Sequence, residues 1–182
     1  MLNRQPTLEG ETLLLRALRD DDWDALYAVA SDPLIWAVHP AHDRWQEPVF
    51  REFFANAMHH RGALAVIDKA SGAIIGSSRY QGFDDADGGS VEIGWTFLAR
   101  AYWGGATNRE LKRLMLSHAL ASVARADFRV GEENVRSRGA MVKIGGQLSD
   151  RTEIAEMAGK SVRHVIYEID RAGFASGPLM AG

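Results

Sequence analysis

One segment near the middle of the chain constrains the fold most, because it combines a strand, a glycine turn and a helix. Residues 91–98 (VEIGWTFL) alternate in the way that predicts a strand with one buried face. The side chains expected on that face are Val91, Ile93, Trp95 and Phe97. A turn with two glycines follows at residues 103–108 (WGGATN), and residues 107–124 carry apolar side chains at helical spacing. The segment therefore predicts a strand and a helix joined by a short glycine-containing loop.

The glycine turn before the predicted helix has the properties of an anion-binding site. The first N–H groups of a helix have no partner within the helix, and they lie at the positive end of the helix dipole. Gly104 and Gly105 have no Cβ atom, so a phosphate can approach their backbone closely. Glycine pairs before helices also occur as ordinary loop punctuation. The turn alone therefore leaves a phosphate site and a simple connection as two open interpretations.

Composition narrows the class of protein. The chain has 182 residues, of which 46% are hydrophobic and 25% charged, and these values are typical of one soluble globular domain. The net charge of −3 predicts no nucleic-acid partner, and the absence of cysteine excludes disulfides and a cysteine nucleophile. No apolar run approaches the ~20 residues that cross a bilayer, and the first residues lack the apolar core of a signal peptide. We therefore expect a single domain over residues 1–182, cytoplasmic, with no membrane partner.

The remaining patterns give the order of the elements. Residues 12–18 predict a strand, and Asp20–Asp22 follow as candidate N-cap residues for a helix that ends at Asp32-Pro33. Residues 35–46 have no clear period and are expected to form a loop, and a second helix is expected to begin at Pro48. The later predictions are a hairpin at 63–67 and 73–80, a strand at 127–131, a helix at 134–144, a closing hairpin at 147–154 and 162–169, and a frayed end from Arg171. This order predicts an α/β fold with a mixed, mostly antiparallel sheet covered by helices.

Four segments in this order carry a resemblance to a known family. They read TLLLRALRDDDWDALYAVASDP, VIDKASGAIIGSSRY, VEIGWTFLARAYWGGATNRELKRLM and ENVRSRGAMVKIGG. Together they resemble the GNAT superfamily of N-acetyltransferases, and within it the branch of the Rim-type ribosomal-protein acetyltransferases. The resemblance extends over about residues 8–170. It implies that acetyl-CoA, the cosubstrate, lies between two splayed strands at residues 91–98 and 127–131, and it implies no metal.

The resemblance assigns the glycine turn to the pyrophosphate of acetyl-CoA. The family's loop reads Gln or Arg, two residues, Gly, one residue, then Gly or Ala. Residues 101–106 (AYWGGA) fit this pattern except at Ala101, where the basic residue is absent. The residues expected to bind the cofactor are Phe97, Leu98, Tyr102, Trp103, Gly104, Gly105, Ala106, Thr107, Asn108 and Asn134. One or two of the basic residues around the turn are expected to reach the phosphates, from the set Arg100, Arg109, Lys112 and Arg113.

Acetyl transfer to an amine requires that the amine lose a proton and that the developing oxyanion be stabilised. Glu92 is the candidate general base, because it lies in the strand expected to hold the thioester, on the face opposite Val91 and Ile93. Its alternative interpretation is a surface glutamate on an edge strand. Backbone N–H groups near Phe97 and Leu98 are the candidates for the oxyanion.

Asn134 and Ser137 fit the N-x-x-S segment that follows the second splayed strand in the family. On this resemblance Asn134 would bind the pantetheine arm or open the helix, and Ser137 could protonate the departing thiolate. The alternative is that both residues simply cap the helix. The chain has no cysteine and no evident Ser–His pair, which favours direct attack in a ternary complex over an acyl-enzyme.

The acceptor is expected to be a small-molecule or peptide amine. Trp36, Arg44 and Trp45 lie in the predicted loop that shapes the acceptor site in the family. The same loop holds His39, His42 and Asp43, but without a fourth ligand we predict no metal site. A homodimer is left open.

Two other functions remain open at this point. One is a non-catalytic acyl-CoA-binding module that acts as a sensor or scaffold. The other is a nucleotide-phosphate enzyme that uses the Gly104-Gly105 turn and takes a magnesium-binding carboxylate from the acidic turn at residues 84–87.

Overall fold

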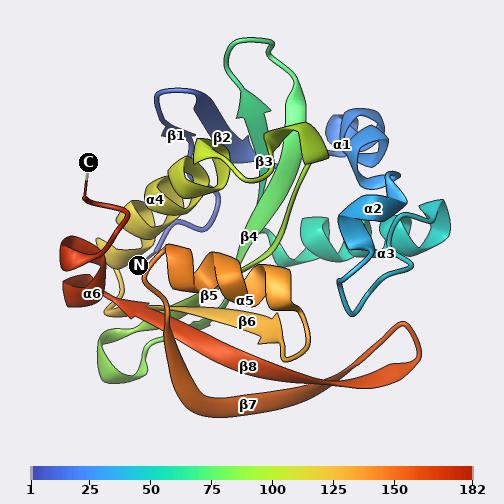
Figure 1. The fold of residues 1–182 in the computed structure, drawn as a ribbon. Helices are drawn as coiled ribbons and strands as arrows, with labels where there is room; N and C mark the ends of the chain where they lie inside the picture. Colours follow the sequence, from blue (N-terminus) through green and yellow to red (C-terminus); the bar gives the residue numbers. More distant parts are fainter. Residues whose placement is uncertain (1, 182) are drawn as a thin grey trace.

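The computed structural model describes residues 2–181, and in them eight strands form one open sheet in the order β1-β2-β3-β4-β5-β6-β8-β7 (Figure 1). Neighbouring strands are antiparallel except for β5 and β6, which are parallel. The strands are β1 (Leu8–Glu9), β2 (Leu13–Ala17), β3 (Ala63–Asp68), β4 (Ile74–Asp84), β5 (Ser90–Leu98), β6 (Arg125–Gly131), β7 (Gln147–Met157) and β8 (Lys160–Asp170). The mixed, mostly antiparallel sheet confirms the predicted fold class.

Apart from α5, the helices lie in two groups, each with its own apolar cluster. The α-helices are α1 (Trp23–Ala30), α2 (Pro33–Trp36), α3 (Glu47–His60), α4 (Ala106–Leu120), α5 (Val135–Lys143) and α6 (Arg171–Ser176). Figure 1 shows α1, α2 and α3 gathered at one side of the molecule, with α4 and α6 at the other. The larger cluster joins α4 to the sheet, and the smaller one joins α1, α2 and α3 to it. None of the helices described in residues 2–181 has the length and apolar character needed to cross a bilayer.

The aspartates before α1 do not cap it as predicted. Residues 20–22 form a short 3-10 turn, and the Asp22 side chain makes no capping bond to α1. Its carboxylate instead accepts two hydrogen bonds from the Arg16 guanidinium, both at 2.7 Å, and one from the backbone N–H of Arg19 at 2.9 Å. The prediction was wrong because a charged partner on β2 competes successfully for the carboxylate.

The loop predicted at residues 35–46 begins later than expected, because α2 occupies its start. Pro33 opens this one-turn helix, and the Asp32 side chain accepts a hydrogen bond from the Leu34 N–H at 3.0 Å. Four residues are too few to produce a helical period, so the sequence pattern did not reveal the helix.

A β-bulge in β5 overturns the predicted alternation of its side chains. Ser77 pairs with Phe97 and Arg79 pairs with Gly94, so β5 has one residue more than β4 in this interval. Trp95 takes the left-handed conformation there, with φ of 53°. Before the bulge, Val91 and Ile93 belong to the α4 cluster, whereas after it Phe97 belongs to the cluster of α1–α3. The bulge therefore turns Phe97 to the opposite face from the one predicted.

Residues 171–176 form α6, which corrects the prediction of a frayed end from Arg171. The Asp170 side chain caps α6 by accepting from the Gly173 N–H at 2.6 Å. The Arg171 guanidinium donates to the carbonyls of Leu120 at 2.8 Å and Val123 at 3.1 Å, at the C-terminal end of α4 and just beyond it. The sequence did not predict α6, because its helical propensity is weak and contacts with residues far away in the sequence leave no local pattern.

The two central parallel strands separate soon after they meet. Within residues 2–181 the ladder between β5 and β6 joins only Ser90–Glu92 to Arg125–Asp127. Beyond this point β5 continues along β4, whereas β6 pairs with β8 along its whole length. The sheet thus opens between β5 and β6, as expected for strands that hold a ligand between them.

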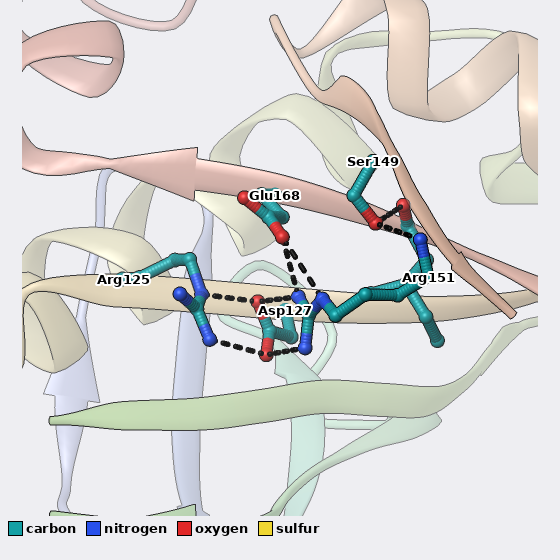
Figure 2. A network of polar contacts seen from close by, with 6 residues as sticks. Arg125, Asp127, Ser149, Arg151 and Glu168 are labelled. Atoms are coloured by element: carbon teal, nitrogen blue, oxygen red, sulfur yellow. Dashed lines mark hydrogen bonds and ion pairs between the residues drawn. The ribbon is translucent and has the colours of Figure 1, made fainter. Parts of the chain in front are cut away.

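A network of charged side chains holds β6 to the β7–β8 hairpin at the level where β5 leaves it (Figure 2). Asp127 accepts from Arg125 at 2.8 Å on its own strand and from Arg151 on β7 at 2.9 Å. Arg151 also donates to Glu168 on β8, at 2.6 Å. The network spans three strands and fixes β6 on the far side of the opening.

Candidate active site

The glycine turn is open to a ligand. Gly104 has φ of 72°, and Gly105 is the extended N-cap residue of α4 without a side-chain capping bond. A Cβ atom built on either glycine would meet no atom within 4 Å. The turn is therefore not crowded on the side of either missing Cβ atom, and no side chain caps the first N–H groups of α4, which fits the pyrophosphate of coenzyme A.

An arginine that the sequence prediction missed lies against this turn. The Cζ atom of Arg136, in the first turn of α5, lies 4.3 Å from the ring centre of Trp103. Its Nη2 donates to the Ile35 carbonyl at 2.7 Å, and Trp103 Nε1 donates to the Leu98 carbonyl at 2.9 Å. The only signal in the sequence was the position of Arg136 two residues after the expected cap Asn134.

The basic residues predicted to surround the turn are largely engaged elsewhere. Arg100 forms an ion pair with Asp32, next to α2. Arg109 donates to the carbonyls of Pro178 and Ala181 in the C-terminal segment. The prediction of phosphate contacts from this set therefore receives no support from these two side chains.

Lys112, one of the basic residues predicted around the glycine turn, is buried beneath the opening between β5 and β6. Its side chain leaves α4 with only 3% of the residue exposed. The ammonium nitrogen donates to Thr96 Oγ1 on β5 at 2.7 Å and lies 5.6 Å from the ring of Phe128 on β6. Burial lowers the pKa of Lys112 to about 7, because no carboxylate in residues 2–181 pairs with it.

We expect the buried Lys112 to make the protein more stable as the pH rises from about 7 to 10.5. Between pH 7 and 10.5 the unfolded chain keeps the lysine proton that the folded protein has lost, so the free energy of unfolding rises with pH. The slope contributed by this group approaches about 1.4 kcal/mol per pH unit. Urea unfolding at several pH values should show the rise in the wild type and lose it in Lys112→Met. Lys160→Met, which removes an exposed lysine, serves as the control, and equal slopes in all three proteins would contradict the prediction.

Glu92 lies at the point where β5 and β6 separate. It belongs to the last pair of the ladder, with Asp127, and its side chain is 20% exposed. Its Oε1 lies 3.3 Å from Nε of Arg129 on β6. Because β5 is flanked by β4 and β6, the alternative of an edge-strand glutamate is wrong.

The surroundings of the Glu92 carboxylate suit a proton acceptor. Burial raises the pKa of Glu92, and the charge of Arg129 opposes this increase. A Cβ atom at Gly94 would lie 3.4 Å from Glu92 Oε1, and one at Gly82 would lie 3.9 Å from Oε2. The two glycines therefore leave space beside the carboxylate for a substrate group.

The candidate cofactor and acid residues near α5 have structural roles as well. Asn134 caps α5 by accepting from the Ser137 N–H at 3.1 Å, and only 3% of Asn134 is exposed. The capping interpretation is therefore confirmed for Asn134, while the acid role of Ser137 stays a prediction. The Tyr102 hydroxyl donates to Asp68, the last residue of β3, at 3.3 Å.

Of the three residues predicted to shape the acceptor site, only two lie together. Trp36 is 2% exposed, and Arg44 lies over its ring at 5.2 Å. Trp45 lies apart: its ring is at the surface, and its carbonyl accepts from the Tyr27 hydroxyl of α1 at 3.2 Å. Trp36 and Arg44 thus lie together, whereas Trp45 does not join them.

Two further arginines on the Glu92 face were not predicted as site residues. Arg79 on β4 and Arg129 on β6 lie 4.9 Å and 5.6 Å from the ring centre of Trp95. Arg79 is 1% exposed, which is unusual for an arginine. Its position near the end of a predicted strand (residues 73–80) whose other residues are small, apolar or aromatic was the available signal.

The features proposed for other functions lie away from this centre. The acidic turn at residues 84–87 precedes β5, whereas the glycine turn follows its other end. Within residues 2–181, no group of three or more His, Asp or Glu side chains is placed to hold a metal ion. A hollow of about 650 Å³ beside α1 is lined by Arg16, Asp32 and Arg100 among others, and Glu92 does not line it.

Comparison with known proteins identifies the family. The family model of the acetyltransferase (GNAT) domain matches residues 12–147. A probable GNAT-family acetyltransferase from Chromobacterium violaceum is 20% identical with a TM-score of 0.84, covering 97% of this chain and 91% of that one. RimJ of Mycobacterium smegmatis in complex with CoA-disulfide is 16% identical with a TM-score of 0.74, covering 99% and 95%. The spermidine N-acetyltransferase of Vibrio cholerae, in complex with CoA and spermine, is 16% identical with a TM-score of 0.69, covering 92% and 100%.

Proposed function

The chain belongs to the GNAT family of acetyltransferases, and on that basis we propose that it transfers the acetyl group of acetyl-CoA to an amine by direct attack in a ternary complex. The observation that carries this proposal is the position of Glu92, at the last residue pair before β5 and β6 separate. The open glycine turn at the other end of β5 supports it, because one strand then links an anion site to a buried carboxylate.

The chain offers separate groups for each part of coenzyme A. The N–H groups at residues 105–108 would hold the pyrophosphate, aided by the positive end of the α4 dipole. The edge of β5 beyond Glu92 is not paired with β6 and would hydrogen-bond the pantetheine arm, as an added strand would. Acetyl-CoA supplies the acetyl group as an activated thioester.

Glu92 would accept a proton from the ammonium group of the acceptor, directly or through water, so that the neutral nitrogen can attack. Arg129 positions the Glu92 carboxylate by its ion pair. Backbone N–H groups near Phe97 and Leu98, just after the bulge, would stabilise the oxyanion. As the bond from nitrogen to the acetyl carbon forms and the C–S bond breaks, Ser137 would donate its hydroxyl proton to the departing sulfur and would regain a proton from water.

The class of acceptor is an amine, either a peptide N-terminus or a small molecule. The likeness to RimJ supports the Rim-type branch and a peptide acceptor, whereas the likeness to a spermidine N-acetyltransferase supports a small amine. At these identities neither likeness selects the acceptor. The remaining alternative is a non-catalytic acyl-CoA-binding module, which Glu92→Gln would leave unaffected.

Initial-velocity kinetics test the proposed reaction. We expect free coenzyme A to appear only when an amine acceptor is added, and we expect intersecting double-reciprocal lines when both substrates are varied. Direct attack requires both substrates on the enzyme together, whereas an acyl-enzyme route gives parallel lines. The measurement is thiol release across a panel of peptides and small amines, with amine-free reactions as the control. Parallel lines together with an isolated acetylated enzyme would contradict the ternary complex.

A further inference from the structure

Arginine and aromatic side chains alternate across the side of the sheet that faces α3. Arg44, in the loop between α2 and α3, lies with Cζ 4.5 Å from the ring centre of Phe53. Arg79 lies 5.4 Å from the same ring and 4.9 Å from the ring of Trp95. Arg129 follows at 5.6 Å from Trp95. Two guanidinium groups therefore share one phenylalanine ring, and a third shares the next aromatic ring.

These arginines differ in how their charge is neutralised. Arg129 has carboxylate partners, with Glu92 at 3.3 Å and Glu153 at 3.1 Å. Arg44 and Arg79, which we call the arginine pair, form no ion pair within residues 2–181. The pair therefore brings two positive charges together with no carboxylate in direct contact, and the charges of Asp43 on Arg44 and of Glu92 on Arg79 act only from farther away.

The hydrogen-bond donors of the arginine pair are also incompletely used. Arg79 Nη1 donates to the side-chain oxygens of Asn56 at 2.7 Å and Gln81 at 3.0 Å. Arg79 Nε is buried and has no partner in residues 2–181. The half-buried Arg44 guanidinium makes no hydrogen bond within the same residues. Arg79 Nη2 donates to the Phe53 carbonyl at 3.5 Å. Buried donors normally have partners, so Arg79 Nε and the Arg44 guanidinium are the donors left for a ligand.

The positive charges in this region contribute to lowered pKa values of the groups beside them. Burial, followed by the charge of Arg79, lowers the pKa of Arg44 to about 10. Burial, followed by the charges of Arg44 and Arg136, lowers the pKa of His39 to about 3, so that this imidazole is neutral. An anion placed between Arg44 and Arg79 would relieve this repulsion and satisfy the free donors.

We propose that the acceptor is a compact amino carboxylate, of which an α-amino acid is the simplest, with its carboxylate bound by Arg44 and Arg79 and its amine at Glu92. This inference rests on the proposed acetyl transfer and names its substrate class. Arg79 pairs across the ladder with Gly94, and Gln81 pairs with Glu92, so Arg79 and the base lie on one face of neighbouring strands. Arg44 reaches the same side from the α2–α3 loop, over the Phe53 ring that Arg79 also contacts. A polyamine carries only positive charges and would be repelled by the same field.

The test compares amines that differ only in the carboxylate. The wild type, with acetyl-CoA, is offered each standard amino acid and the corresponding α-amide. We expect at least one amino acid to react with kcat/KM about 10- to 100-fold above its amide, from a charge-assisted bond to guanidinium. Arg44→Gln and Arg79→Lys should raise KM for that amino acid and reduce its advantage over the amide. Arg51→Gln, which changes an exposed α3 arginine that pairs with Glu47, is the matched control and should keep the advantage.

Each outcome separates this inference from the proposed function. Calorimetric titration of acetyl-CoA into the wild type and the two arginine-pair variants should show equal affinity, which also establishes that the variants are folded. Equal turnover of acids and amides, or turnover of neither while acetyl-CoA binds, would overturn the amino-carboxylate assignment and leave the acetyl-CoA site intact. Turnover of Asp- or Glu-initiated peptides in place of free amino acids would overturn the small-molecule assignment. Failure of the wild type to bind acetyl-CoA would instead overturn the proposed function.

Discussion

Gly105→Glu should remove the binding of acetyl-CoA while leaving the protein folded. A side chain at this position points into open space, where no atom lies within 4 Å of an added Cβ, so the substitution costs the fold little. The backbone of Gly105 is extended, with φ of −119°, which a glutamate can adopt. A carboxylate placed within about 4 Å of the pyrophosphate site would oppose it by about 4 kcal/mol, a loss of roughly 1,000-fold in affinity.

Isothermal titration of acetyl-CoA is the measurement, with circular dichroism and thermal unfolding as checks on the fold. Gly105→Gln has nearly the same size without the charge and distinguishes repulsion from steric exclusion. Gly105→Ala should fold like the wild type, because a methyl group meets no protein atom there, and its affinity measures how far a Cβ atom alone hinders the approach of the phosphate. Unchanged affinity in the folded glutamate variant would place the pyrophosphate elsewhere and contradict the assignment of the turn.

Replacing the Glu92 carboxylate by an amide should reduce kcat by about 10²- to 10⁴-fold, the usual contribution of a general base. Glu92→Gln preserves the size of the side chain but cannot accept a proton from the acceptor ammonium. Acetyl-CoA affinity should stay close to that of the wild type, because the predicted cofactor contacts lie at the other end of β5. Thiol-release kinetics combined with calorimetry separate the two effects.

The pH profile gives Glu92 a signature that a purely structural residue would lack. Burial raises the pKa of Glu92 above its ordinary value of 4.5, so kcat/KM should fall as the pH is lowered through this raised pKa. The variant should lose this acid limb. Glu153→Gln is the matched control, because it removes the other carboxylate that pairs with Arg129, at 57% exposure. Wild-type activity in Glu92→Gln would favour the non-catalytic binding module.

The sequence predicted most of the elements because their signals are local. Strands such as β5 and helices such as α4 can be predicted from the period of their apolar side chains. The turn between β5 and α4 can be predicted from its glycine content. The bulge at Trp95 could not be predicted, because it follows from a mismatch in length between β4 and β5 rather than from any residue in β5. The alternation rule therefore failed from Trp95 onward.

The candidate site was harder to predict for a related reason. Glu92 could be placed on a face of its strand by the period alone, and the structure puts it there. Arg79 and Lys112 were missed or misplaced, because sequence rules put charged side chains at the surface. Both are buried, one against Asn56 and the other against Thr96. Long-range partners, not local sequence, determine where such charges lie.

The separation of β5 from β6 has an energetic consequence for any ligand that enters between them. Only Ser90–Glu92 of β5 are committed to the ladder with Arg125–Asp127, so the backbone groups farther along that edge are not used for pairing between the two strands. A ligand that lies along this edge would form hydrogen bonds without first breaking any bond of this ladder. The edge is thus preorganised: its shape is fixed when the chain folds, and the association step loses little conformational freedom in the backbone.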